Sequence, residues 1–185
     1  MYLLTETASP FALERWAAFF ANFGQFTKGF FYTLGISIGA LIVALLLGLI
    51  FGAMSSTHNK VLRGISRVYV EIFQNTPLLV QFVVVFYGIS ILTDGHVMIP
   101  ISLTAILCVG VYTGAYISEI IRTGIEAVPK GQTEAALSQG FTYADTMRII
   151  ILPQAVRTIL PPLTNQVVNL IKNTSTVAII SGADI

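Results

Sequence analysis

Three asparagines near the C-terminal end of the sequence have the spacing of a single helical face. Asn165, Asn169 and Asn173 lie four residues apart in an otherwise apolar segment, and a helix aligns side chains at that spacing. Their carboxamides donate and accept hydrogen bonds without carrying a charge. A polar stripe on an apolar helix has to face another helix or a wet cavity. The pattern therefore predicts either a hydrogen-bonded contact between helices or one wall of a path for a polar solute.

Residue patterns that could support catalysis or metal binding do not form a site. The pattern Gly35-x-Ser37-x-Gly39 matches a hydrolase nucleophile motif, but it lies within an apolar segment and not at a strand-to-helix turn. His58 and His96 are expected in loops on opposite sides of a membrane, so they cannot share a metal. The sequence therefore predicts no catalytic residue, no cofactor-binding residue and no metal ligand.

The composition predicts the environment in which these residues work. Of the 185 residues, 55% are hydrophobic and 10% are charged, with a mean hydropathy of +0.80. A soluble domain has about a quarter of its residues charged, so this chain is expected in a lipid bilayer. Ten lysines and arginines against nine acidic residues make no basic face for nucleic acid.

Four segments are long and apolar enough to cross a bilayer, which takes about 20 residues. Residues 29–57, 72–93 and 97–118 carry no charge. The fourth segment, 158–183, is expected to open at Pro161-Pro162, and it contains Lys172, so it spans only with a polar interior. The sequence therefore predicts an all-α membrane protein of about four spans.

Pairs of glycines four residues apart are typical of surfaces where membrane helices pack closely. Such pairs occur at positions 35 and 39, 48 and 52, and 110 and 114. One ion pair is also predicted, because Glu119 lies three residues before Arg122 and this spacing makes the two side chains neighbours on a helix. Ionisable residues at membrane depth are often functional, so a gating role is the alternative to a structural one.

The distribution of cations predicts the orientation of the spans, because lysine and arginine concentrate in cytoplasmic loops. Three cations follow the first span, none follows the second and four follow the third. This places residues 58–67 and 122–157 in the cytoplasm and the N-terminus outside. The aromatic N-terminal segment, residues 1–26, is expected to lie outside or in the membrane interface.

Residues 124–157 are too polar to span a membrane but carry helix signals. Pro129 interrupts the preceding helix, and residues 132–139 are good helix formers. Gly140 supplies a left-handed helix end. A short helix is therefore predicted between the proline and the glycine.

A second helix is predicted directly after the first. Thr142 and Asp145 have the spacing of a capping box, and the helix that they start is expected to run to Leu152-Pro153. Two short helices at a sharp bend suit docking into a groove on a soluble partner. A loop that merely connects two spans is the alternative.

The spacing of residues in this segment resembles the EAA signature of permease subunits from bacterial ATP-binding-cassette (ABC) importers. All seven positions of the signature are present, namely Glu134, Ala135, Ala136, Gly140, Ile150, Leu152 and Pro153. Four further blocks resemble the polar amino-acid branch of that family, namely residues 71–81, 114–122, 128–132 and 172–175. The resemblance covers roughly residues 25–183.

The resemblance implies a type I ABC importer transmembrane domain of the MetI-like fold, residues 27–185, with residues 124–157 as its coupling loop. Such a chain is a multi-pass permease of the bacterial inner (plasma) membrane and not an enzyme. Its implied partners are a cytoplasmic ABC ATPase, a second permease subunit of the same or a sister chain, an external or periplasmic solute-binding protein and the lipid bilayer. The sequence has no phosphate-binding loop, so no cofactor is expected here and the partner ATPase uses the ATP.

The resemblance also implies roles for individual residues. The ATPase contact is assigned to Glu134, Ala135, Ala136 and Gly140, with Leu152 and Pro153 as a hinge into the fourth span. The substrate pathway is assigned to Thr76, Pro77, Asn165, Gln166, Asn169 and Asn173. Because the stripe offers amides and no carboxylate, a neutral or acidic amino acid is a better fit than arginine or lysine.

Two features depart from the family pattern. Gln74 stands where the family usually has an arginine, which alters the charge balance around Glu71. Family members usually continue through one more span, so the sequence predicts the five-span architecture without its last helix.

The alternative function is a secondary transporter or channel subunit. That alternative calls for charge relays or internal repeats, and the halves of the chain show no convincing repeat.

Overall fold

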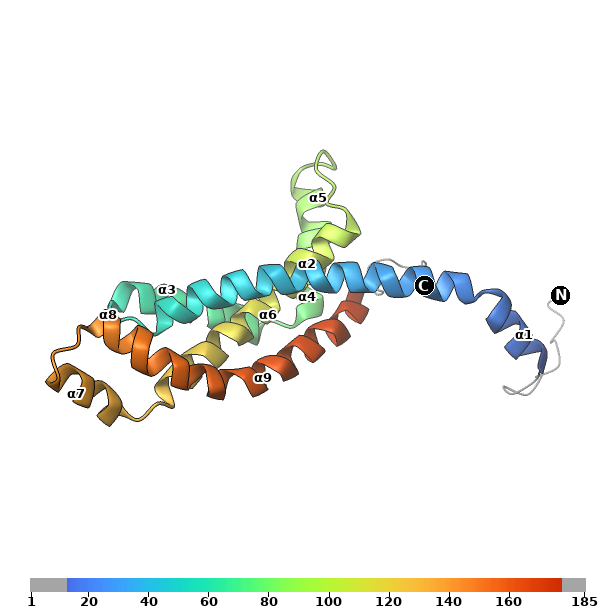
Figure 1. The fold of residues 1–185 in the computed structure, drawn as a ribbon. Coiled ribbons are helices and arrows are strands. Elements are labelled where there is room, and N and C mark those ends of the chain that lie inside the picture. Colours follow the sequence, from blue (N-terminus) through green and yellow to red (C-terminus); the bar gives the residue numbers. More distant parts are fainter. Residues whose placement is uncertain (1–12, 178–185) are drawn as a thin grey trace.

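The computed structural model describes residues 13–177, a part of the chain that contains helices and loops and no strand. The all-α fold class is therefore confirmed (Figure 1). In chain order the helical elements are α1 (Leu13–Ala21), α2 (Phe23–Ser55), α3 (Lys60–Asn75), α4 (Leu78–Val83), the π-helix η1 (Val84–Gly88), α5 (Ile89–Leu92), α6 (Ile101–Glu126), α7 (Lys130–Ser138), α8 (Tyr143–Asp145), the π-helix η2 (Thr146–Ile151), α9 (Leu152–Asn173) and the 3₁₀-helix η3 (Thr174–Val177).

Helix α2 is continuous from Phe23, so the expected boundary between residues 26 and 27 falls inside it. Residues 1–12 and 178–185, which include the outer parts of the predicted N-terminal segment and of the fourth span, lie outside the described residues. The first helix that the structure describes, α1, carries the aromatic side chains of Trp16, Phe19 and Phe20 on its exposed surface. Exposed aromatic side chains at this end of the chain fit the predicted interfacial segment.

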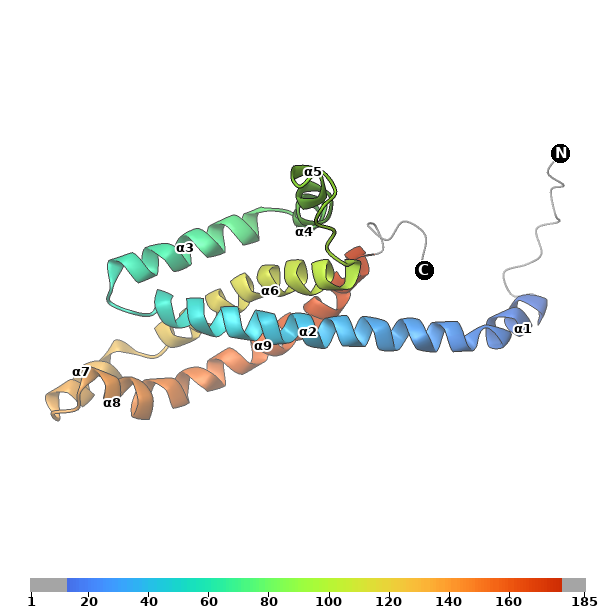
Figure 2. The same ribbon diagram turned by 90° about the horizontal axis from the view of Figure 1, so that it is seen from above.

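Helices α2 and α6 form the core and run side by side in the same direction (Figure 2). They approach closely because glycines leave room for side chains of the other helix. A Cβ atom on Gly110 would lie 2.8 Å from the Cβ atom of Val43, and one on Gly48 would lie 2.4 Å from Cγ2 of Ile117. The predicted packing role of the glycine pairs at 48/52 and 110/114 is thus confirmed. It does not extend to Gly35, which has nothing within 4 Å.

The distribution of side-chain sizes on α2 is that of a membrane helix. Most of its buried residues are small, including Ala40 and Ala44, whereas Ile42, Leu46 and Leu49 point outward and are exposed. Water would oppose such an arrangement, because large apolar side chains gain most from burial. In lipid no such penalty applies, and small residues at the contact let the backbones approach. The pattern therefore indicates that the outer surface of α2 faces lipid.

By length and composition, two helices of the described chain are able to cross a membrane, α2 and α6. A third span is present if α3 and the α4 to α5 stretch are counted as one bent pair. Helix α9 is not among them, because its amides and Lys172 make it more polar. The span predicted for the fourth segment therefore stays a prediction.

The second apolar window, residues 72–93, is not one straight span as predicted. Helix α3 ends at Asn75, and the α4 to α5 stretch starts at Leu78 after a bend of 98°. Pro77 has no amide hydrogen, and its ring forces Thr76 into an extended conformation with ψ of 123°. Figure 2 shows α3 beside α2 and α6, while α4 and α5 turn away. A single proline barely changes the average hydropathy of the window, so composition alone did not reveal the bend.

One buried side chain holds the two sides of this bend together. The amide nitrogen of Gln81, a residue that is 9% exposed, donates hydrogen bonds to the carbonyl oxygens of Phe73, at 3.2 Å, and Thr76, at 3.0 Å. Both carbonyls lie at the end of α3, where the helix supplies no amide hydrogen for its last carbonyl groups. Gln81 therefore fixes the angle between α3 and α4.

Replacing Gln81 by leucine is expected to destabilise the chain by about 1–3 kcal/mol, because two buried carbonyls lose their donor. The measurement is the midpoint of thermal unfolding in detergent. Gln25→Leu is the matched control, since Gln25 lies exposed on α2 and its side chain makes no hydrogen bond within the described chain. Equal midpoints for the two variants would show that the bend does not depend on Gln81.

The C-terminal helical stretch also differs from the prediction. The second short helix was expected to end at Leu152-Pro153 and the fourth span to open at Pro161-Pro162. The structure instead has one uninterrupted helical stretch from Tyr143 through η2 and α9 to Asn173, with Pro161 and Pro162 inside it. The wide π turn of η2 relieves the conflict at Pro153, because it spaces the preceding carbonyls differently from an α-helix.

Candidate functional site

Helix α7 lies at one end of the molecule, beside α8 and away from α1 (Figure 1). Helix α6 ends at Glu126, and Pro129 caps α7 with the extended ψ of 133° that suits the residue before a first helical turn. The predicted helix over residues 132–139 is therefore confirmed, although it begins two residues earlier, at Lys130. This places the EAA signature on a short helix at the end of the bundle.

The C-terminal end of α7 is closed by backbone hydrogen bonds in the way that the sequence predicts. Gly140 has a φ of +85°, in the left-handed region. The amide of Phe141 donates to the carbonyl of Ala136 at 3.2 Å, and the amide of Gly140 donates to that of Leu137 at 3.0 Å. These two bonds form a Schellman motif. The helix therefore ends at a defined residue and turns sharply into the next one.

The next helix starts with a side-chain cap. The hydroxyl oxygen of Thr142 accepts a hydrogen bond from the amide of Asp145 at 3.2 Å, and the hydroxyl donates to the Asp145 carboxylate at 2.5 Å. The predicted cap is thus confirmed, with the two side chains bonded directly to each other. The short link of Gly140 to Thr142 therefore has a fixed geometry.

The residues of the EAA signature point in different directions. Ala136 is 4% exposed and lies on the side of α7 that packs against η2. Glu134 and Ala135 are exposed, and Leu137 beside them is 47% exposed. Ala136 thus holds α7 in place, whereas Glu134, Ala135 and Leu137 form an outward surface.

Leu152 and Pro153 do not form a break in this structure, because the helix continues through them. Pro153 cannot donate to the preceding turn, and the side-chain amide of Gln154 donates to the carbonyl of Ile150 at 2.8 Å. A wide π turn directly before a proline is a place where a helix can change its bend. The hinge role of Leu152 and Pro153 stays a prediction.

The predicted polar stripe is on the outside of this chain. Asn165 and Asn169 are exposed, and Gln166 and Asn173 are half-buried, while Leu170 faces the core and is 1% exposed. Within the described residues, these four amide side chains make no hydrogen bond. They therefore do not join helices of the same chain, which was one of the two readings of the pattern.

Thr76 and Pro77 lie at the bend between α3 and α4. Thr76 is half-buried, and its hydroxyl donates to the carbonyl of Ile72 at 2.7 Å. Pro77 is exposed and precedes the first turn of α4. The structure thus assigns both residues to a broken helix, a feature that membrane proteins tolerate where backbone is buried in protein or lines a cavity.

The predicted ion pair on α6 is present and larger than expected. The guanidinium of Arg122 donates to Glu119, with Nε 3.0 Å from Oε2, and to Glu126, with Nη1 2.6 Å from Oε2. Gln74, which replaces the usual arginine, donates to the carbonyl of Ala115 at 3.2 Å and so joins α3 to α6. The charge of Glu71 is balanced by Arg67, at 2.7 Å.

Sequence reasoning missed three polar side chains that tie helices together. The hydroxyl of Tyr69 donates to the carbonyl of Val111 at 2.7 Å, and that of Ser66 donates to the carbonyl of Phe51 at 2.7 Å. Gln81 is the third. In the sequence, the only feature that marks these residues is that each is polar and lies next to or within an apolar segment. Among residues 13–177, no group of three or more histidine, cysteine, aspartate or glutamate side chains is placed to bind a metal.

The fold defines an α-helical membrane protein with a short helix, α7, that exposes Glu134, Ala135 and Leu137 at one end. Residues 44–183 match the family model of the binding-protein-dependent transport system inner membrane component. The chain belongs to this family, whose members are permease subunits of transport systems and not enzymes. The comparisons give no support to the alternative of a secondary transporter.

Individual relatives agree with this assignment. The "Probable glutamine ABC transporter permease protein GlnM" of Bacillus subtilis is 41% identical over 169 residues, which are 90% of this chain and 76% of the relative. The glutamate/aspartate import permease protein GltJ of Escherichia coli K12 is 36% identical over 171 residues, 87% of this chain and 70% of the relative.

Solved structures confirm the architecture. The crystal structure of an amino acid ABC transporter with histidines superposes with a TM-score of 0.82 and 33% identity, covering 91% of this chain and 77% of the other. The MetNI methionine ABC transporter in an inward-facing conformation gives a TM-score of 0.67 at 18% identity, covering 83% of this chain and 73% of the other. The second likeness establishes the fold alone, and it confirms the MetI-like class.

Proposed function

We propose that this permease subunit imports a polar amino acid and that α7 connects it to a cytoplasmic ABC ATPase. The observation that carries the coupling role is the construction of α7. Its Schellman motif and the cap that Thr142 gives to the next helix fix its C-terminal end, Ala136 is buried against η2, and Glu134 and Ala135 are exposed to a partner. In this proposal the partner uses the ATP and the chain itself needs no cofactor.

The orientation and the other partners belong to the same proposal. The N-terminus lies outside and α7 lies in the cytoplasm of a cell whose inner (plasma) membrane holds the chain. The count of cations in the loops supports this orientation, and the parallel course of α2 and α6 supports the alternation of the spans, because the first and third spans of an alternating chain must run the same way. A second permease subunit completes the pathway, and an external or periplasmic solute-binding protein delivers the solute.

The substrate class is supported by relatives and by the stripe on α9. Relatives are named for glutamine, for glutamate and aspartate and for arginine, which supports a polar amino acid, and the preference among these solutes rests on the stripe alone. Amides on α9 can bind the carboxamide or carboxylate of such solutes by hydrogen bonds, and the stripe offers no carboxylate to a cationic side chain. We therefore propose a neutral or acidic amino acid in preference to arginine or lysine.

The proposed pathway runs along the exposed amides of α9. Asn165, Gln166, Asn169 and Asn173 line it, and the bend at Thr76 and Pro77 contributes backbone that interrupts the helix. Interrupted helices supply such backbone in transporters. Leu152 and Pro153 allow α9 to change its angle when α7 moves with the ATPase.

The test of this function is transport by the reconstituted system. Proteoliposomes are prepared with the chain, the ATPase encoded beside it and the corresponding binding protein, and ATP-dependent uptake of labelled glutamine, glutamate and arginine is measured. We expect uptake of glutamine or glutamate to exceed that of arginine and to require ATP. Uptake that continues without the ATPase would contradict the proposal.

Replacing Asn169 by leucine is expected to lower the uptake rate about tenfold, because one lost hydrogen bond to the solute costs about 1–2 kcal/mol. Assembly with the ATPase should not change, since Asn169 is exposed and has no partner within the described chain. The matched control is Val168→Leu, which alters the adjacent exposed residue without removing a polar group. If Asn169→Leu transports as fast as Val168→Leu, the stripe does not line the path.

A further inference from the structure

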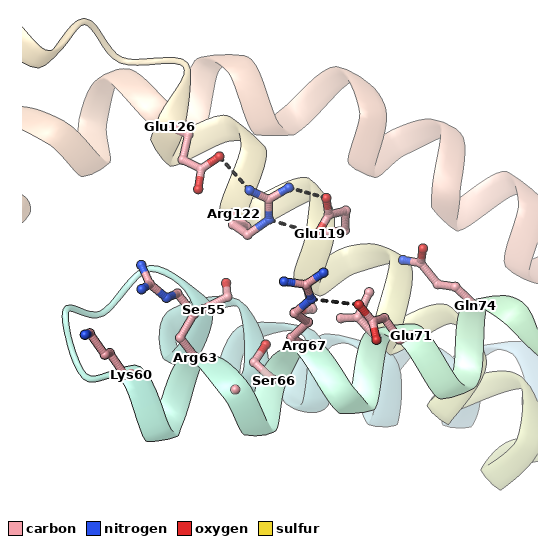
Figure 3. A pocket seen from close by; sticks show the side chains of 13 residues that line it. Ser55, Lys60, Arg63, Ser66, Arg67, Glu71, Gln74, Glu119, Arg122 and Glu126 are labelled. Carbon is pink, nitrogen blue, oxygen red and sulfur yellow. Dashed lines mark hydrogen bonds and ion pairs between the residues drawn. The ribbon is translucent and has the colours of Figure 1, made fainter.

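A cavity of about 560 Å³ that is lined by charged side chains lies between α3 and α6 (Figure 3), at the end of α6 that leads into α7. The α3 wall contributes three cations and one carboxylate, namely Lys60, Arg63, Arg67 and Glu71. The α6 wall contributes two carboxylates and one guanidinium, namely Glu119, Glu126 and Arg122. The two walls therefore carry net charges of opposite sign.

No ion pair between described side chains crosses this cavity. Among the residues that the structure describes, each ion pair joins side chains of one helix, Arg67 with Glu71 on α3 and Arg122 with its two glutamates on α6. Lys60 and Arg63 have no ion-pair partner in the described chain. In Figure 3 the guanidinium of Arg67 points toward the α6 wall. The cavity thus offers a positive side and a negative side to whatever enters it.

An apolar surface begins next to the charged cavity. Val61, Ile65, Val68 and Ile72 are exposed along α3, between 49% and 68%, and their spacing of four, three and four residues places them on one helical face. The same helix therefore presents a charged face to the cavity and an apolar face outside it. A ligand that matches both faces has a charged head and a hydrocarbon tail.

We propose that the cavity binds the headgroup of a phospholipid that carries both a phosphate and a primary ammonium. The phosphate lies against Lys60 and Arg63, the ammonium against the carboxylates of the α6 wall, and the acyl chains follow the apolar face of α3. Basic pockets at the ends of membrane helices bind lipid phosphates in this way. The carboxylates distinguish this site from one for a purely anionic lipid, and the apolar face distinguishes it from one for a soluble solute.

The test is native mass spectrometry of the full chain, purified from membranes, delipidated and offered phosphatidylethanolamine, phosphatidylglycerol or phosphatidylcholine with the same acyl chains. Phosphatidylglycerol lacks the ammonium, and the quaternary ammonium of phosphatidylcholine donates no hydrogen bond. We expect phosphatidylethanolamine to give the highest occupancy. Soluble phosphoethanolamine is offered in a parallel arm, and it should displace the lipid only weakly.

Substitutions test the contributions of the two cavity walls to lipid binding one at a time. The double variant Lys60→Gln/Arg63→Gln is expected to reduce phosphatidylethanolamine occupancy about tenfold or more, because each cation near a lipid phosphate contributes to binding. Glu126→Gln should remove the preference for phosphatidylethanolamine over phosphatidylglycerol. Arg157→Gln is the control, since Arg157 is exposed on α9, outside the cavity, and has no ion pair within the described chain.

Three results would overturn the proposal. Equal occupancy by phosphatidylglycerol and phosphatidylethanolamine would show that the ammonium is not recognised. A loss with Arg157→Gln as large as that with the double variant would show that binding is a general effect of positive charge. Displacement by phosphoethanolamine at concentrations equal to those of the lipid would make the ligand a soluble molecule. Circular dichroism of each variant confirms that it is folded, so a loss of binding is not a loss of structure.

Discussion

An Ala135→Trp chain is expected to insert and fold normally but to lose its ATPase. Ala135 is exposed at the centre of the outward surface of α7, so an indole side chain meets no obstacle within the chain. A partner that packs closely on that surface has no room for it. Disruption at the centre of an interface lowers the binding free energy by about 2 kcal/mol or more. This corresponds to about a 30-fold loss of affinity. The measurement is copurification of the ATPase with the tagged chain.

Two further tryptophan variants make this result specific. Ala17→Trp places the same side chain on an exposed position of α1 at the other end of the molecule, and it should retain the ATPase. Ala136→Trp is expected to destabilise the chain itself, because Ala136 is buried against η2. Undiminished capture by Ala135→Trp would mean that the ATPase binds elsewhere, and the coupling role of α7 would be wrong.

Gly140 allows a second test, which asks whether ATPase capture depends on the backbone conformation at the end of α7 and not only on its exposed side chains. Its φ of +85° is accessible to glycine and, at a smaller cost, to asparagine, whereas a residue with a branched Cβ is strained there. Gly140→Val should therefore lose ATPase capture while Gly140→Asn retains most of it. Equal behaviour of the two would show that the left-handed end of α7 is not needed for coupling.

Replacing Gly48 by alanine is expected to lower the thermal stability of the chain more than the addition of one methyl group at any other position of α2. The new Cβ would lie 2.4 Å from Cγ2 and 2.7 Å from Cβ of Ile117, a β-branched side chain that is almost fully buried. Neither helix can yield locally, so α2 and α6 must move apart. Overpacking of this kind costs about 1–3 kcal/mol, and the contacts that tie α3 to both helices weaken as well.

The control for this prediction lies on the same helix. Gly35 has nothing within 4 Å of its would-be Cβ, so Gly35→Ala adds only the higher helix propensity of alanine, about 1 kcal/mol in favour of the helix. The unfolding midpoint should fall for Gly48→Ala and stay or rise for Gly35→Ala. A midpoint for Gly48→Ala equal to that of the native chain would show that the α2–α6 contact is looser than the structure describes.

Local rules account for much of what the sequence predicted correctly. The ends of α7 follow from Pro129 and Gly140, and the cap of α8 follows from Thr142 and Asp145, because each depends on residues a few positions apart. The EAA spacing is of the same kind, and it led to the permease family before any contact was known. The glycine pairs at 48/52 and 110/114 also indicated close packing, although not which helices would meet.

The predictions were wrong where a single residue changed the backbone although the average hydropathy of its segment did not show it. They were also wrong where a residue made a contact with a distant part of the chain. Pro77 bends the second apolar window by 98°, although the window looked continuous. Pro161 and Pro162 looked like a helix start but lie inside α9, because the preceding turns are already held by η2 and by the core. Gln74 was interpreted as the loss of the charge that the usual arginine carries, but in the structure its side-chain amide donates a hydrogen bond to the carbonyl of Ala115 on α6.

The sequence by itself determined the membrane environment, the class of fold, and the short helix that carries the EAA signature with its ends, because hydropathy and helix capping are properties of short segments. Only the tertiary structure decided which way each residue faces. It put Ala136 inside and Ala135 outside, turned the amides of α9 away from the chain's own core, and brought Lys60 and Arg63 opposite Glu119 and Glu126 across a cavity. These outcomes depend on how α2, α3, α6 and α9 pack, and that packing joins residues too far apart in the sequence for any spacing rule to connect them.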